Sequence, residues 1–309
     1  MTICVHGPDG HDGRLPLYGT ATERARAWLL IEHPGPWPAH LDEMKTPPPM
    51  GSVVSEAEER GIRVQLIRRP RERRVPPPLQ VYAAWSAGPD AWIEGRELAG
   101  RGDLRQLDLD ALAEGRSPLL GERIGGRLLL VCTHGRRSAC CARLGRPLAV
   151  TLADRFPEQV WETTHVGGDH FAANLVCLPH GLYYGRVSPT GAGTVAAAYG
   201  RGEIVLEHYR GRAGLPGPLQ AAEYFVRAET GRLLIDEVSV ESAEGLTAGP
   251  AVTEALVHAN GSRYRVVVEE VAEAERGTCG LPCPEADARY RLVDLAPAAA
   301  GLSLRQSAE

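Results

Sequence analysis

The sequence lacks the features that mark secreted and membrane-spanning proteins. Its seven cysteines are too few for a disulfide framework in a chain of 309 residues, and their odd number agrees with reduced thiols. No stretch approaches the roughly 18 apolar residues that a membrane-spanning helix needs. The first residues lack the basic and apolar segments of a signal peptide. We therefore expect a cytoplasmic protein with no membrane partner.

Lysine is also scarce, and positive charge is carried almost entirely by arginine. The formal net charge is −5, and Lys45 is the only lysine among 34 basic residues. Nucleic acid is not expected as a partner, because phosphate binding needs a basic face. The one dense basic run lies in residues 68–74, and we expect a solvated loop there, since charge blocks are usually exposed. The alternative is a docking patch for an acidic redox partner.

Several catalytic and binding motifs are missing as well. The sequence contains no C-x-x-C pair of the thioredoxin type, and no glycine turn is followed by the G-K-[ST] of a phosphate-binding loop. The paired carboxylates of a glycosidase cannot be assembled. No repeat with a period of roughly 20–50 residues is found. Enzymes of these classes are not expected.

The composition is that of a globular protein with a large core, and the chain divides into three regions. Residues 1–120 are expected to form an α+β N-terminal region, with strands within 24–37, 62–69 and 79–87 and a short acidic helix or turn within 107–116. Residues 237–309 are expected to form C-terminal strands and a frayed tail, with strands at 233–242 and 263–271.

The middle region, residues 121–236, alternates strands and helices. Its patterns predict a strand at 126–134, a helix at 140–157, a strand at 159–166 and a hairpin at 171–187. A helix interrupted near residues 200–202 is expected over 193–211. This order is typical of a thioredoxin-like α/β (α+β) layer, a small mixed sheet with helices on its faces.

Three cysteines lie close together at the start of this region. Cys132 ends the first strand, and Cys140 and Cys141 come where the next helix begins. The positive end of the helix dipole and the arginines around them favour thiolates, which metal ligation and nucleophilic attack both need. Two adjacent residues rarely point at one metal, so only one of Cys140 and Cys141 is expected to be a ligand.

A second group follows the strand at 159–166. His165 ends that strand, Gly167 and Gly168 allow a tight turn, and Asp169 and His170 follow directly. Zinc would suit two cysteines and two histidines, but its thiol ligands usually occur as closer pairs. The longer cysteine loop suits something larger than one ion. Rieske centres show that two thiolates and two imidazoles can share a two-iron cluster.

The segments 19–37, 132–149, 161–187 and 219–227 resemble the bacterial branch of the sucrase/ferredoxin-like family. The resemblance implies a thioredoxin-like ferredoxin with one 2Fe-2S cluster, held by two cysteines nine positions apart and by two histidines in H-x3-H. These positions fall on Cys132, Cys141 and His165, which would bind iron, and on Asp169, which departs from the pattern.

This departure leaves the fourth ligand open. The candidates are Asp169, His170 and a C-terminal cysteine, Cys279 or Cys283. The further alternatives are a labile cluster with three protein ligands and the absence of a cluster. Carboxylate is a hard ligand for iron–sulfide, so His170 ranks slightly above Asp169.

Other residues near the cluster are expected to support it. Cys140 remains an unused neighbour of the ligands. Gly167 and Gly168 would let the backbone approach the cluster. His134 would either donate a hydrogen bond to a cluster sulfide or cap its own loop. Cys4 and Cys177 are expected to be core residues.

The leading functional hypothesis is an electron carrier with an unidentified redox partner protein, rather than an enzyme with its own substrate. The first alternative is a thiol–disulfide or redox-sensing protein in which Cys132 works with Cys140 or Cys141. The second is a structural zinc domain.

Overall fold

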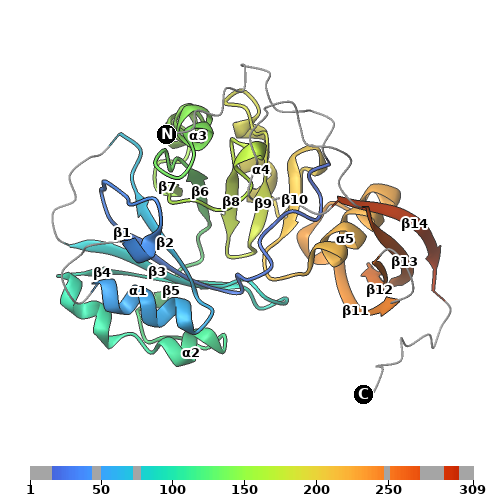
Figure 1. Ribbon diagram of the computed structural model, residues 1–309, viewed down its shortest axis with the longest axis horizontal. Coiled ribbons are helices and arrows are strands. Elements are labelled where there is room, and N and C mark those ends of the chain that lie inside the picture. Colours follow the sequence, from blue (N-terminus) through green and yellow to red (C-terminus); the bar gives the residue numbers. More distant parts are fainter. Residues whose placement is uncertain (1–15, 44–49, 72–77, 247–250, 272–288, 299–309) are drawn as a thin grey trace.

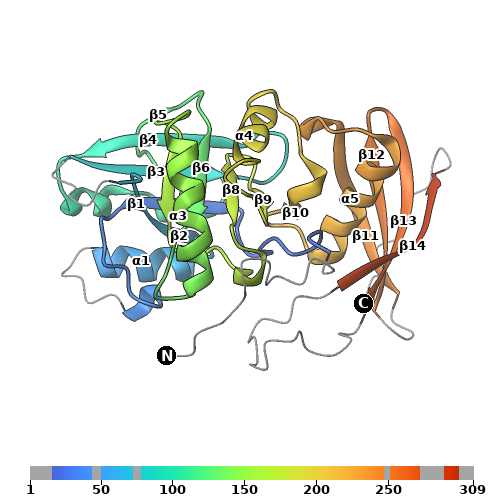
Figure 2. The ribbon, with the colours of Figure 1, turned by 90° about the horizontal axis from the view of Figure 1, so that it is seen from above.

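The chain forms two β-sheets, a mixed sheet of ten strands and an antiparallel sheet of four. The computed structural model describes residues 16–43, 50–71, 78–246, 251–271 and 289–298. Figures 1 and 2 show the small sheet at the opposite end of the molecule from strands β1–β5. No helix in the described ranges is both long and apolar enough to cross a membrane.

The large sheet has the strand order β10-β9-β8-β6-β7-β2-β1-β3-β4-β5. Its strands are β1 (Ala27–Glu32), β2 (Arg63–Arg68), β3 (Leu79–Trp85), β4 (Trp92–Leu98), β5 (Glu122–Arg123), β6 (Leu128–Cys132), β7 (Val160–Thr163), β8 (Leu175–Leu178), β9 (Leu182–Tyr184) and β10 (Tyr209–Arg212). The helices are α1 (Met50–Glu59), α2 (Leu109–Ala113), α3 (Ala139–Ala153), α4 (Ala192–Gly200) and α5 (Gly217–Thr230).

The middle region confirms most of the predicted elements. The strand β6, the helix α3, the strand β7 and the β8–β9 hairpin all occur where the sequence predicts them. The prediction of a helix over 193–211 is wrong beyond Gly200, where α4 ends. Gly202 adopts φ +79°, and the chain then joins the large sheet as β10. The observed α/β architecture agrees with the predicted fold class. The helices α1 and α5 and the strands β4, β12 and β14 are among the elements additional to the prediction.

The large sheet consists of two halves with the same topology. In the first, β1 pairs parallel to β2 and antiparallel to β3, which continues to β4. In the second, β6 pairs parallel to β7 and antiparallel to β8, which continues to β9. The strands β2 and β7 join the halves in antiparallel register, with Ile67 opposite Thr163. Glu32 and Cys132, the last residues of β1 and β6, therefore occupy matching positions.

The two halves enclose a shared central core. Strands β3 and β4 run crosswise to β8 and β9 in Figure 1, and side chains from both halves meet between them, among them Trp28, Leu30, Tyr82, Leu130 and Tyr183. The outer face of the first half is covered by α1 and α2. The outer face of the second half is covered by α3 and α4. One sheet therefore contains strands from residues 1–120 and from residues 121–236.

The prediction of a solvated loop at residues 68–74 is wrong for the first residues of that range. Arg68 lies in β2 and is 8% exposed, and its guanidinium forms an ion pair with the buried Glu162 at 2.6 Å. The guanidinium of Arg69 lies 3.7 Å from the ring centroid of Trp161. These arginines hold the β2–β7 junction because β7 brings a carboxylate and an indole to them. Residues 72–77 lie outside the described ranges.

The small sheet is attached to the large one through α5. Its strands are β11 (Val238–Leu246), β12 (Val252–Ala259), β13 (Ser262–Val271) and β14 (Arg289–Pro297), in that order. One face packs on α5. The strand expected at 233–242 begins only at Val238, because residues 235–237 form a 3-10 turn. Buried Glu223 of α5 pairs with Arg227 at 2.9 Å and with Arg212 of β10 at 3.3 Å.

Candidate metal centre

Cys132 faces the central core because side chains alternate along β6. Leu129 and Val131 point to the core beneath α3 and α4, whereas Leu128, Leu130 and Cys132 point to the central core. The side chain of Cys132 is 1% exposed. Its sulfur therefore lies where the second half of the sheet meets the first.

Cys141 approaches Cys132 because α3 crosses closely over the end of β6. The helix begins at Ala139, so Cys140 and Cys141 lie in its first turn. Gly145 contacts the strand one turn later, and a Cβ atom there would lie 2.0 Å from the carbonyl oxygen of Cys132. A residue without a side chain is required at this crossing, and it sets the distance between strand and helix.

Cys132, Cys141 and His165 form one compact group. Their ligand atoms all lie within 4.8 Å of one another, and Cys141 Sγ is 3.7 Å from His165 Nδ1. Both cysteines are buried and His165 is half-buried. This is the only such group of metal-ligating side chains within the described ranges. The structure thus brings together the three residues that the sequence predicts as iron ligands.

Cys132 and Cys141 share a hydrogen bond, and the proton in it belongs to the Cys141 thiol. Hydrogen bonding from the Cys141 thiol, together with His165 and the backbone N–H of His134, holds the pKa of Cys132 well below its usual range despite its burial. Donation to Cys132 and burial raise the pKa of Cys141. Burial also raises the pKa of Cys140. The expectation of thiolates at Cys140 and Cys141 is therefore wrong, because burial raises the pKa of Cys140, and donation to Cys132 together with burial raises the pKa of Cys141.

His134 holds the backbone of His165 in place. Its Nδ1 accepts a hydrogen bond from the His165 N–H at 3.1 Å. With Nδ1 acting as an acceptor, Nε2 carries the proton and donates it to the Pro38 carbonyl at 2.7 Å. The ring also packs edge-on against Trp37. Both ring nitrogens are thus committed to the backbone, and His134 fixes His165 relative to the N-terminal half.

Sequence reasoning missed the part of the N-terminal half that supports His165. Arg63 Nη2 donates to the His165 carbonyl oxygen at 3.2 Å, across 102 positions of the chain. The Thr164 hydroxyl accepts a hydrogen bond from the Leu66 N–H at 3.1 Å. No local signal in the sequence marks Arg63 for this role, since the contact depends on the pairing of β2 with β7.

A buried guanidinium holds the glycine turn after His165. Gly167 and Gly168 have φ values of +92° and +66°, which favour glycine. Arg210 is 1% exposed and donates to the Gly167 carbonyl at 3.0 Å and to the Asn174 side chain at 2.9 Å. The Asn174 amide in turn donates to the Gly168 carbonyl at 2.7 Å. The turn is therefore fixed from the core side.

Asp169 and His170 lie on the 3-10 turn Asp169–Phe171 and remain outside the group of three. The charge of Asp169 contributes to the raised pKa values of Cys140 and Cys141, so its carboxylate lies near the thiols. The His170 ring instead packs against Phe171, with 4.0 Å between the ring centroids. The described residues thus supply three ligands and leave the fourth position open.

The other cysteines divide into buried and undescribed ones. Cys140 is 2% exposed and lies outside the group of three. Cys177 of β8 lies in the core beneath α3 and α4, where burial raises the pKa of its thiol. The positions of Cys4, Cys279 and Cys283 lie outside the described residues, so a C-terminal fourth ligand stays a prediction.

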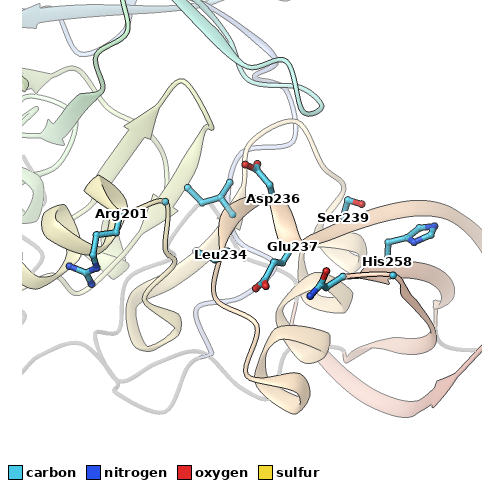
Figure 3. A pocket seen from close by; sticks show the side chains of 10 residues that line it. Arg201, Leu234, Asp236, Glu237, Ser239 and His258 are labelled. Atoms are coloured by element: carbon cyan, nitrogen blue, oxygen red, sulfur yellow. The ribbon is translucent and has the colours of Figure 1, made fainter.

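A separate cavity of about 490 Å³ lies between the end of α4 and the small sheet. Its lining contains Asp236, Glu237, Ser239 and His258, and contains no cysteine. Figure 3 shows Asp236 and Glu237 pointing in different directions, so their carboxylates do not converge on one ligand. The chemistry of the donors therefore singles out the group around Cys132.

We expect the variant His134→Phe to weaken metal retention about 10- to 100-fold, the range found when an outer hydrogen-bond partner of a ligand is lost. The phenyl ring cannot accept the His165 N–H bond that His134 makes. Retention is measured as bound metal during titration with a chelator. The matched control is His40→Phe, which changes an exposed histidine nearby. Equal retention in both variants would contradict a positioning role for His134.

The comparisons with known proteins identify a family. A family model described as Sucrase/ferredoxin-like matches residues 17–211, which is more than half of the 309 residues. The matched range ends within β10 and contains all strands of the large sheet up to that point, together with the group around Cys132. No curated protein and no solved structure matches the chain.

Proposed function

Because the chain belongs to the sucrase/ferredoxin-like family, we propose that Cys132, Cys141 and His165 hold a 2Fe-2S cluster and that the protein transfers single electrons. The observation that carries the proposal is the convergence of two thiols and one imidazole within 4.8 Å in a buried position. Such a cluster accepts and releases one electron without forming bonds to a substrate.

The donor set fits iron. Thiolates and imidazoles are the ligands that iron–sulfur centres use, and a mixed set is known from Rieske centres. The lowered pKa of Cys132 supplies one thiolate before any metal binds. Cys141 keeps its proton in the metal-free protein, so cluster binding should release a proton and should tighten as the pH rises.

The surrounding residues would orient and shield the group. His134 and Arg63 hold the backbone of His165 from two sides. Apolar side chains of the central core surround both cysteines, among them Leu130 and Trp161, and exclude water from the sulfur atoms. A protected site of this kind suits electron transfer, because water and competing ligands reach the metal poorly.

We propose that the fourth ligand of the cluster comes from the turn after Gly168, from either Asp169 or His170. The carboxylate of Asp169 acts on the pKa values of both neighbouring thiols, whereas the ring of His170 packs against Phe171. Ligand softness still ranks His170 slightly above Asp169, because carboxylate is a hard ligand for iron–sulfide. If Asp169 is the ligand, an exchange Asp169→His replaces an anion by a neutral imidazole and should raise the reduction potential.

A zinc site is the second candidate, favoured by the compactness of the group. Three ligand atoms within 4.8 Å also suit one tetrahedral ion with a fourth position open. A thiol–disulfide function is less well supported. Cys132 and Cys141 are 1% and 0% exposed, so a disulfide substrate has no path to the thiolate.

The test is an absorption spectrum with iron, sulfide and zinc assays on anaerobically purified protein, followed by an EPR spectrum after reduction with dithionite. We expect visible absorption bands, near-stoichiometric iron and sulfide, and a reduced signal with a mixed nitrogen–sulfur ligand shell, altered in Asp169→His if Asp169 is the fourth ligand. Stoichiometric zinc without colour would establish the second candidate. A colourless, metal-free protein after anaerobic reconstitution would sink both.

A further inference from the structure

A cavity of about 460 Å³ opens beside the metal centre, and His165 and His134 form part of its wall. The rest of the lining comes mainly from the N-terminal half of the chain. We propose that this cavity binds a small anionic molecule with carboxylate or phosphate groups, next to the metal-ligating His165. Its basic residues are Arg24, His40, Arg63 and Arg137.

The charge of the lining carries the choice of an anion. Arg24, Arg63 and Arg137 contribute three positive charges against the single carboxylate of Glu58, which leaves the lining positive with its histidines neutral. The chain as a whole carries −5. A positive hollow on a negative protein attracts anions locally. Guanidinium groups match carboxylate and phosphate oxygens in a bidentate geometry.

The positive groups come from three separate segments of the cavity lining. Arg63 is anchored by the His165 carbonyl at 3.2 Å, so its charge is held at the inner wall. Arg137 Nη1 lies 3.2 Å from His40 Nε2, which places a cation and an imidazole together at another part of the wall. Arg24 adds a third charge from the loop before β1. The charges thus converge from three segments of the chain.

The size and the apolar lining favour an organic anion. A volume of about 460 Å³ lies within the range of roughly 300–1,000 Å³ typical of small-molecule sites. Leu41, Ile62 and Val64 provide apolar wall beside the arginines. An inorganic ion alone would leave this part of the cavity unused.

A bound anion would act on the metal centre through His165. This step rests on the proposed function, in which Nδ1 of His165 faces the metal, as its 3.7 Å approach to Cys141 Sγ indicates. His165 also lines the cavity, so a bound anion would lie beside this residue. A negative charge there disfavours the added electron, so an occupied cavity should lower the reduction potential. By linkage, reduction should weaken binding of the anion to the same extent.

The experiment measures binding to the full-length, metal-free protein by calorimetry at low ionic strength. The probes are pyrophosphate for phosphate chemistry, malonate for carboxylate chemistry, and uncharged malonamide as the reference. We expect at least one anion to bind and malonamide to fail. Arg137→Ala and Arg24→Ala should weaken binding about tenfold or more, because each removes a charge-assisted contact.

Matched controls come from two exposed arginines that lie one or two positions away in the sequence and do not line the cavity. Arg136→Ala, matched to Arg137, and Arg26→Ala, matched to Arg24, remove these exposed charges, and they should leave affinity nearly unchanged. Equal losses in all four variants would mean nonspecific attraction and would overturn the inference. Failure of both anions to bind would also overturn it.

The same titrations separate this inference from the proposed function. Anion binding to metal-free protein does not depend on a cluster, so it survives if the protein proves unable to hold iron. Conversely, a protein with a normal cluster and no anion binding would retain the proposed function and lose the cavity site. Binding by pyrophosphate alone or by malonate alone identifies which acid group the cavity selects.

Discussion

Exchange of Cys132 or Cys141 for serine is expected to remove the metal group almost completely, whereas Cys140→Ser should retain it. Cys132 and Cys141 both lie in the group of three, and Cys140 lies outside it although it is adjacent in sequence. A serine hydroxyl stays protonated at neutral pH and is a poor ligand for iron. The loss of metal affinity should exceed the roughly 10- to 100-fold loss expected when a hydrogen-bond partner of a ligand is removed.

The measurement is iron, sulfide and zinc content per chain, together with visible absorption, for the three serine variants prepared in parallel. Cys140→Ser is the matched control, since it removes an equally buried thiol from the same helical turn. Circular dichroism checks that all three remain folded. A bleached Cys140→Ser beside an intact Cys141→Ser would show that the wrong member of the adjacent pair was assigned to the metal.

A large loss of both stability and metal binding is also expected for Gly145→Ala. A Cβ atom at this position would lie 2.0 Å from the Cys132 carbonyl oxygen, which is backbone and cannot move without shifting β6 or α3. Overpacking of this kind costs about 1–3 kcal/mol or more in the free energy of unfolding. The same shift separates Cys141 from Cys132, so metal retention should fall together with stability.

Thermal unfolding and metal content of Gly145→Ala are compared with those of Gly200→Ala. Gly200 ends α4, and a Cβ atom there meets nothing within 4 Å, so the control should unfold and bind metal like the parent protein. A normal melting temperature and normal metal content in Gly145→Ala would contradict the close crossing of helix and strand. Loss of metal with an unchanged melting temperature would mean that the substitution disturbs only the geometry of the ligands.

Local patterns were sufficient to predict the ligand-bearing segments of the fold. The apolar run ending in Cys132 predicted β6. The strand predicted to end in His165 corresponds to β7, but β7 ends at Thr163, so His165 lies two residues beyond the strand. These predictions hold because alternation and turn chemistry act between near neighbours. The pattern failed after Gly200, where β10 is decided by pairing with β9 rather than by its own residues.

The sequence could not predict what surrounds the ligands. The contacts of His165 with Arg63 and of His134 with Pro38 join residues about a hundred positions apart. They depend on the β2–β7 pairing, which no periodicity in the sequence encodes. The proton distribution in the cysteine pair also depended on burial and on the hydrogen bond between the two thiols, not on the helix dipole.

The sequence by itself determined the chemistry of this protein: the family, the two thiols and imidazole that can hold a metal, and the local elements that carry them. The family resemblance had already assigned Cys141 rather than Cys140, and the tertiary structure supplied the cause, since α3 crosses closely over β6 at Gly145. Only the tertiary structure decided that the N-terminal half closes over the centre and lines a positive cavity beside His165. The physical reason is that chemistry belongs to residue types, whereas distance and burial arise from contacts between segments far apart in the chain.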